Sequence, residues 1–169
     1  MRRLLALLAL PLVAWAAAHV PFFPDDPGPF VVDAPTVSKA YYLRSERGTV
    51  HAFVVPPVAR SIPLQLLVVD DELGAQLAYR VMLDCGDGPR ALRAVDVPFF
   101  ERFSGIAHRI RVADALGPTA TSCTIEVTQI AGPPGPYTLS MGDEERFTLR
   151  DVAGLLTLNQ RLDRWRSGE

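Results

Sequence analysis

The chain has 169 residues, of which 49% are hydrophobic and 21% charged, and its formal net charge is −2. This length suits a single domain with a full hydrophobic core, and the weakly acidic sequence has no basic patch of the kind that nucleic-acid binding requires. The sequence therefore predicts no nucleic-acid partner.

Residues 1–18 have the three-part organisation of a secretory signal peptide. Arg2 and Arg3 are followed by an apolar run over residues 4–15 and by alanines at 16–18, which suit signal-peptidase cleavage. The apolar run is shorter than the roughly 20 residues that cross a bilayer as a helix. We therefore expect cleavage before His19 and an extracytoplasmic protein, periplasmic or secreted. An uncleaved membrane anchor is the alternative.

Residues 19–38 form a proline-rich arm. Five prolines interrupt this segment, so it should be neither a continuous helix nor a continuous strand. We expect the arm to lie extended over the domain surface. The prolines are Pro21, Pro24, Pro27, Pro29 and Pro35.

Residues 39–147 are predicted to form an all-β domain. Short apolar or alternating segments recur at intervals of about 10–15 residues, with glycine-rich or acidic turns between them and no helical periodicity. This pattern favours an antiparallel β-sandwich of about seven strands. The expected strands are residues 39–43, 49–55, 64–69, 76–83, 106–112, 123–130 and 136–141. The expected core residues are Leu66, Leu77, Tyr79, Val81, Ile110, Ile125, Val127, Tyr137 and Leu139.

Residues 148–169 are predicted to form a C-terminal amphipathic helix and tail. Apolar side chains recur there at helical spacing, and Thr148 with Asp151 can cap the first turn. The stripe consists of Val152, Leu155, Leu158, Leu162 and Trp165. The helix is expected to pack on the sandwich or to lead to a partner. The alternative is contact of residues 148–166 with a membrane surface, where arginines would meet lipid headgroups.

Cys85 and Cys123 are the two cysteines of the chain. In an exported protein two cysteines predict one disulfide, whose loop would stabilise the fold by roughly 3–4 kcal/mol in the chain-entropy model. Two unpaired buried thiols are the alternative.

His19 would become the first residue after cleavage, and its imidazole and free α-amine could then chelate one copper ion. A second imidazole, from His51 or His108, would complete the T-shaped arrangement called a histidine brace. His19 and the expected sandwich resemble exported copper proteins such as lytic polysaccharide monooxygenases and periplasmic copper-resistance carriers. A histidine on an apolar strand face is, however, more often a hydrogen-bonded buried residue than a metal ligand.

The acidic turns around Asp70, Asp71 and Glu72 and around Asp84 and Asp87 offer oxygen ligands for calcium. Neither turn has the spacing of a calcium-binding loop, so solvated turn carboxylates are the expectation. The sequence also has no nucleophile elbow, P-loop or dinucleotide-binding fingerprint.

The segments at residues 123–128 and 135–142, the latter with the form G-x-Y-x-L, resemble the last two strands of pre-peptidase C-terminal-type β-sandwich domains. Residues 40–43, 50–54 and 64–69 are similar to their earlier strands, and residues 142–147 resemble a group of uncharacterised exported or membrane-anchored bacterial and archaeal proteins. The resemblance covers about residues 41–147. It implies an extracytoplasmic accessory or binding module without catalytic residues.

These observations predict an exported, non-enzymatic binding module at the cell envelope, without a cofactor and with an unidentified protein or envelope partner. A copper-binding protein that uses His19 with His51 or His108 is the alternative function.

Overall fold

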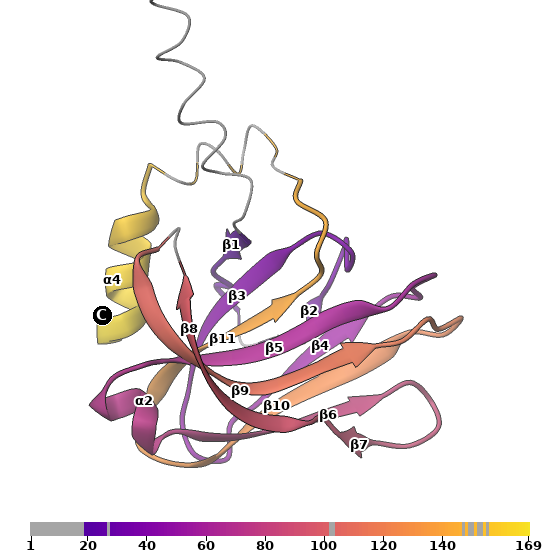
Figure 1. Ribbon diagram of the computed structural model, residues 1–169, viewed down its shortest axis with the longest axis horizontal. Helices are drawn as coiled ribbons and strands as arrows, with labels where there is room; N and C mark the ends of the chain where they lie inside the picture. Colours follow the sequence, from indigo (N-terminus) through magenta and orange to yellow (C-terminus); the bar gives the residue numbers. More distant parts are fainter. Residues whose placement is uncertain are drawn as a thin grey trace, which may run out of the picture.

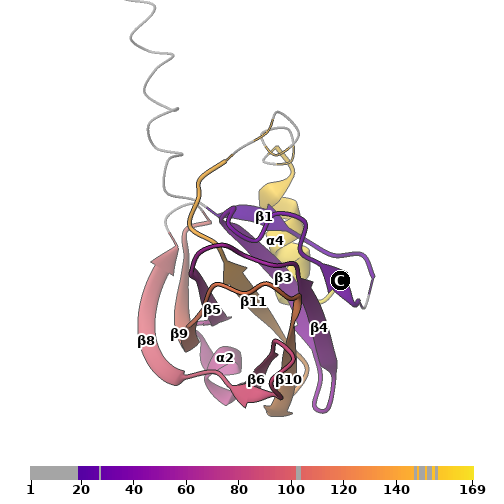
Figure 2. The same cartoon turned by 90° about the vertical axis from the view of Figure 1, so that its right-hand side faces the viewer.

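The computed structural model describes residues 19–26, 28–101, 104–146, 148, 151, 154 and 156–169. The predicted signal peptide, residues 1–18, lies outside the described residues. Within them, eleven strands form two sheets that face each other, and α4 (Leu158–Ser167) lies beside the first sheet (Figures 1 and 2). The protein is therefore mainly β and has the two-layer organisation of a β-sandwich.

The two sheets differ in width. The first has six strands in the order β1 (Val20–Phe22), β3 (Lys39–Ser45), β11 (Gly135–Met141), β5 (Ile62–Val69), β9 (Ile106–Leu116) and β8 (Ala94–Glu101). The second has five in the order β2 (Phe30–Val31), β4 (Val50–Val55), β10 (Cys123–Ala131), β6 (Ala78–Asp84) and β7 (Arg90–Ala91). All seven expected strands occur, with shifts of a few residues at their ends.

The prediction of about seven strands was too low because four strands carry weak signals. Strands β1 and β2 lie in the proline-rich arm, β7 has two residues, and β8 contains Pro98. Proline removes a ladder hydrogen bond and is accommodated at sheet edges, where β1, β2 and β8 all lie. The sheets are also not wholly antiparallel, because β1 pairs with β3, and β2 with β4, in parallel.

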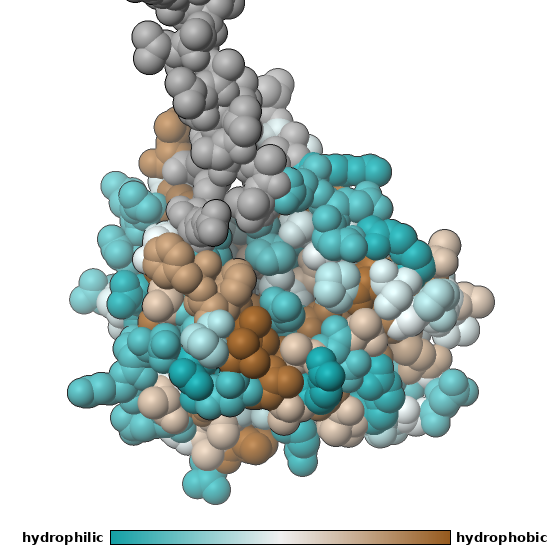
Figure 3. Space-filling model, in the orientation of Figure 1, coloured by the Kyte–Doolittle hydropathy of each residue, from teal (hydrophilic) through white to brown (hydrophobic). Residues whose placement is uncertain are grey.

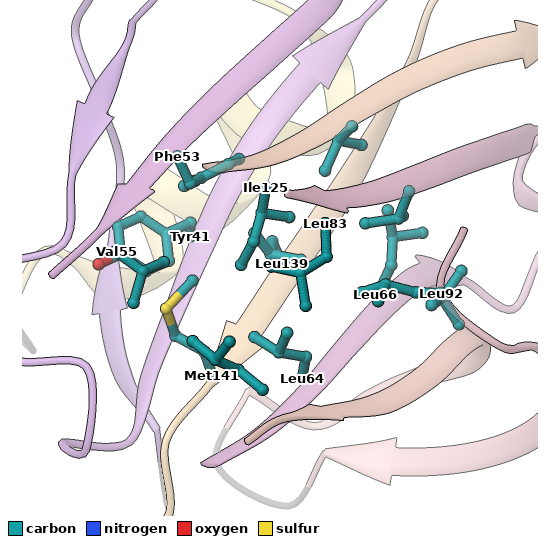
Figure 4. Packing of buried hydrophobic residues seen from close by; sticks show 14 of the residues in the cluster. Tyr41, Phe53, Val55, Leu64, Leu66, Leu83, Leu92, Ile125, Leu139 and Met141 are labelled. Carbon is teal, nitrogen blue, oxygen red and sulfur yellow. The ribbon is translucent and has the colours of Figure 1, made fainter. Parts of the chain in front are cut away.

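Alternating side chains from both sheets meet in the core (Figure 4). Eight of the nine expected core residues are buried, and Tyr79 is partly buried against them. Ile110 is buried outside the cluster between the sheets. The cause is a bulge: Leu66 of β5 pairs with Val112, but the next residue, Leu67, pairs with Ile110. The extra residue in β9 changes which face its N-terminal half presents.

The expected acidic turn at residues 70–74 continues into a short helix, α2 (Glu72–Gln76). The Asp71 carboxylate accepts a hydrogen bond of 2.7 Å from the Gly74 backbone N–H and so caps the helix. A Cβ at Gly74 would lie 1.9 Å from the Val69 carbonyl oxygen, so the helix can approach β5 only with glycine there.

The C-terminal helix packs on the outer face of the first sheet. Leu158, Leu162 and Trp165 are buried against Ala40, Tyr42 and Val69. The Trp165 indole N–H donates a hydrogen bond of 2.8 Å to the Leu43 carbonyl, and the Arg44 guanidinium donates to two carbonyls of the last helical turn. In α4 the apolar stripe therefore faces the sheet. In the alternative prediction this same stripe would contact a membrane surface.

The start of the predicted helix is only partly described. The expected cap is present, because the Thr148 backbone N–H and hydroxyl each donate a hydrogen bond of 2.7 Å to Asp151. Val152 and Leu155 lie outside the described residues. Among the residues that the structure describes, no helix is long and apolar enough to span a bilayer.

The predicted disulfide between Cys85 and Cys123 is confirmed. It joins the end of β6 to the start of β10, next to each other in the second sheet. Because the two cysteines are 38 residues apart in sequence, the bond restricts a long segment of the unfolded chain.

Replacement of Trp165 by alanine should lower the free energy of unfolding by about 3–5 kcal/mol, because it leaves a cavity and an unpaired Leu43 carbonyl. Urea denaturation followed by circular dichroism measures this loss. Asn159→Ala, on the exposed side of α4, should change stability by less than about 0.5 kcal/mol. Equal stabilities of the two variants would show that the helix does not stabilise the sandwich.

Replacement of both cysteines by alanine should lower the free energy of unfolding by about 3–4 kcal/mol, mainly because the unfolded chain gains freedom. Urea denaturation of the variant and of the oxidised protein provides the measurement. After reduction of the disulfide, the free energy of unfolding of the unmodified protein should approach that of the variant. A variant as stable as the oxidised protein would contradict the prediction.

Candidate functional site

His19 is anchored next to β1 by two serines. Its Nδ1 is hydrogen-bonded to the Ser38 hydroxyl, and its Nε2 lies 3.1 Å from the Ser140 hydroxyl oxygen. Burial lowers the pKa of the imidazole, and the negative charges of Glu101 and Glu145 oppose this shift. His19 therefore fixes the start of the arm to the outer face of the first sheet.

His51 faces the opposite direction, into the space between the sheets. Its Nδ1 forms a hydrogen bond of 2.6 Å with the Tyr137 hydroxyl, and its ring packs against Phe30 of β2 at 6.0 Å between ring centres. Burial lowers its pKa. This histidine lies beneath the second part of the arm.

His108 is buried under α4, with only 2% of its surface exposed. Its Nδ1 lies 3.1 Å from the Ile106 carbonyl oxygen, to which it can donate, while Nε2 has no hydrogen-bond partner. The ring centre is 6.5 Å from that of Trp165. Burial is the main cause of its lowered pKa; Glu101 acts against this shift and Arg166 adds to it.

The three candidate copper ligands are therefore not gathered around one point. His19 and His108 lie on the outer side of the first sheet, and the charge of Glu101 acts to raise the pKa of both, whereas His51 lies between the sheets. In the described part of the chain, no group of three or more His, Cys, Asp or Glu side chains is arranged to hold a metal ion. A histidine brace at His19 stays a prediction.

The acidic turns use their carboxylates locally. Asp71 caps α2, and Asp84 accepts a hydrogen bond of 2.7 Å from the Gly86 backbone N–H. Asp70 lies 3.9 Å from the Arg109 guanidinium. These contacts are those of ordinary turn carboxylates.

The largest recess that we describe lies along the N-terminal arm. Two adjoining hollows, of about 710 and 590 Å³, share five lining residues, and we call them together the arm groove. Its walls are formed by α4 and by the arm, including the arm's two short strands β1 and β2. The shared residues are Phe22, Asp26, Phe30, Asp33 and Lys39; the first hollow also contacts Leu158 and Arg161 of α4, and the second contacts Val31 and Tyr41.

The arm is held on both sides of the groove. The Val20 backbone N–H donates a hydrogen bond of 2.8 Å to the Ser38 carbonyl, and the Val32 N–H donates one of 2.9 Å to the Val54 carbonyl. Phe30 packs against Phe53 of the core at 5.0 Å between ring centres. The groove is thus supported by backbone pairing and by buried side chains, which makes its walls well defined.

The groove combines aromatic and acidic side chains. Phe22 keeps 48% of its surface exposed. The Phe23 ring stacks on Tyr42, and the guanidinium carbon of Arg161 lies 4.5 Å from the centre of the Phe23 ring. Asp25 and Asp26 are exposed and have no ion pair in the described part of the chain.

Asp33 of the groove is paired with Lys39, whose hydrogen bond holds the pKa of the carboxyl below its usual range.

A second exposed apolar region lies on the edge strand β8. Val97 and Phe100 are 48% and 60% exposed, and apolar side chains gather in this part of the surface in the space-filling view (Figure 3). This region is an open strand edge, whereas the arm groove is a recess with charged walls.

The arm groove was not predicted from the sequence. Its one visible signal is the run Phe22-Phe23-Pro24-Asp25-Asp26, in which two aromatic residues stand beside two acidic residues in a segment that proline keeps extended. The contribution of α4 to the same recess depends on a contact between the two ends of the chain, which no local pattern reveals.

No protein-family model matches the chain, and no curated protein matches it. Among solved structures, it is similar to PliG of Salmonella Typhimurium, described as a periplasmic lysozyme inhibitor of g-type lysozyme. The TM-score is 0.39 at 9% identity, over 67% of this chain and 95% of that one. A family GH115 4-O-methyl-α-glucuronidase, BtGH115A, also has a TM-score of 0.39, at 13% identity over 63% of this chain and 14% of that one. Neither similarity transfers a ligand or an activity to this chain.

The buried histidines should make stability depend on pH. Each has a folded-state pKa below the 6.5 of an exposed imidazole, so the unfolded chain binds protons first as the pH falls. The free energy of unfolding should therefore fall between pH 7.5 and 5, by at most about 1.4 kcal/mol per pH unit for each histidine. Urea denaturation at several pH values measures the slope.

His51→Gln should give a shallower slope than the unmodified protein over this pH range, because one of the three groups no longer titrates. Asn159→Ala, which changes no titrating group, should keep the full slope. A stability that rises as the pH falls from 7.5 to 5 would contradict the lowered pKa values.

Proposed function

We propose that this chain is a non-enzymatic binding module that works outside the cytoplasm and holds a polypeptide partner in the arm groove. The observation that carries the proposal is the groove itself: two adjoining hollows, walled by both ends of the chain, with a half-exposed phenylalanine and unpaired carboxylates. Concave sites with an apolar lining and a few placed polar groups are the usual form of binding sites.

The location outside the cytoplasm is supported by the disulfide and by the predicted signal peptide. Disulfides persist in oxidising compartments and are rare in the cytosol. The scaffold also suits the binding of a partner, because the disulfide-linked core of two sheets holds the arm and the loops in fixed positions, where they can contact that partner.

A polypeptide is the partner that best fits the groove. Strand β2 is a short edge strand, so it leaves one side of its backbone available to an extended chain, whereas β1 has Pro21, which lacks an N–H, at its centre. The aromatic side chains between them can receive apolar side chains of such a segment. An extracytoplasmic accessory role, implied by the resemblance to pre-peptidase C-terminal-type domains, stays a prediction.

Site-specific photo-cross-linking tests this proposal. A photoreactive phenylalanine is introduced at Phe22 in the groove, at Ile130 on the outer face of the second sheet, or at Phe100 on β8. The control position Ile130 is 46% exposed, closely matching Phe22. After irradiation of the cells that make the protein, we expect a discrete adduct from position 22 and none from position 130.

The adduct is then analysed by mass spectrometry, and the purified partner is tested for binding to the unmodified protein and to Phe22→Ser, which should bind more weakly. The same adducts from all three positions would indicate unspecific collisions. An adduct from position 100 alone would move the interaction to β8. Either result would overturn the proposed site.

A further inference from the structure

We infer that the arm groove receives an extended, cationic segment of another protein, in which lysine or arginine side chains alternate with apolar ones. This inference rests on the proposed function and adds the chemistry of the partner. It follows from the charges that line the groove, from its apolar surface and from its elongated shape.

The acidic side chains of the groove exceed its basic ones. Asp25, Asp26, Asp33 and Asp151 line the two hollows, against Lys39 and Arg161. The basic residues already have partners, because Lys39 is paired with Asp33 and Arg161 lies over the Phe23 ring. The exposed carboxylates of Asp25 and Asp26, which have no ion pair in the described part of the chain, are therefore left to attract a cation from outside.

The groove's own contacts show how it can bind cations. One is an ammonium–carboxylate pair, between Lys39 and Asp33, and the other places a guanidinium 4.5 Å from the centre of an aromatic ring, between Arg161 and Phe23. Phe22 offers a second ring, 48% exposed, within a few residues of two unpaired carboxylates. A lysine or arginine of the partner can therefore repeat both kinds of contact.

Charge alone does not describe this surface, because apolar side chains separate the acidic ones. Phe22 lies in both hollows, Val31 is 73% exposed in the second, and Leu158 borders the first. An extended segment that alternates cationic and apolar side chains presents the two kinds on opposite sides of its backbone. One side can face the carboxylates at the rim while the other contacts the apolar lining.

The shape of the groove favours an extended segment over a compact one. The first hollow reaches Gly154 and, in α4, Arg161, and the second reaches Gly28 and Val31 beside β2, so the recess runs along the arm. Figure 2 shows β1 and α4 close together, with the arm leading from β1 toward β2. An elongated recess between two edge strands accommodates a chain in strand-like conformation.

Peptide binding tests the inference on the oxidised protein comprising residues 19–169. The probe is a fluorescein-labelled peptide of about eight residues that alternates lysine and valine, and fluorescence anisotropy measures its dissociation constant. Matched peptides alternate glutamate with valine or lysine with glycine. We expect the lysine–valine peptide to bind most tightly and its affinity to fall when salt is raised from about 50 to 300 mM.

Paired variants test the position of the site. Asp25→Asn with Asp26→Asn should weaken binding about fivefold to tenfold, the effect of losing two exposed charge contacts. Glu72→Gln with Asp87→Asn removes the same total charge from exposed positions outside the groove and should change the dissociation constant less than about twofold. Arg161→Gln should strengthen binding, because it removes the basic side chain that competes with the partner for the Phe23 ring.

Several results would overturn the inference. These are equal weakening by the two acidic pairs, glutamate–valine binding as tight as lysine–valine binding, or no binding of the cationic peptide. A dimer in light scattering that Phe22→Ser dissociates would make a second copy of this chain the occupant instead. If the cross-link at position 22 forms while the cationic peptide does not bind, the proposed function stands and the partner's chemistry is wrong; loss of both results removes both.

Discussion

The arm groove depends on one structural constraint, which is the attachment of the N-terminal arm to both sheets. Two short parallel pairings, β1 with β3 and β2 with β4, place one piece of the arm on the edge of each sheet. Burial of Val20, Phe30 and Val32 holds these pieces in place, which two or three residues of ladder could not do alone. The arm between them then crosses the open side of the sandwich and forms the groove.

The other wall depends on a contact between the two ends of the chain. Trp165 fixes α4 to the first sheet through its indole hydrogen bond to Leu43 and its edge-on contact with Tyr42. Phe23 of the arm stacks on the same Tyr42 ring and lies under Arg161 of the helix. The arm and the helix are therefore positioned by one shared aromatic residue, and the groove belongs to the folded sandwich as a whole.

Local patterns predicted the strands whose side chains alternate between core and surface, because burial of one face leaves a period of two in the sequence. They failed where that signal is absent. Strand β8 is exposed along most of its length, and β1 and β2 are too short to show a period. Ile110 was expected in the core between the sheets but is not part of it, because the bulge in β9 interrupts the period. The disulfide was predictable from composition, whereas the arm groove depends on long-range contacts of Phe23 and Arg161.

The histidines connect this architecture to pH. His19 holds the start of β1, His51 contacts Phe30 of β2, and His108 lies beneath Trp165 of α4. Each wall of the groove therefore lies next to an imidazole whose pKa is lowered by burial. Protonation of any of these imidazoles would place a positive charge beneath a wall of the groove. Protonation that displaces a wall and a ligand that needs that wall in place would therefore oppose each other. The burial that lowers these pKa values also makes the three histidines part of the groove's support.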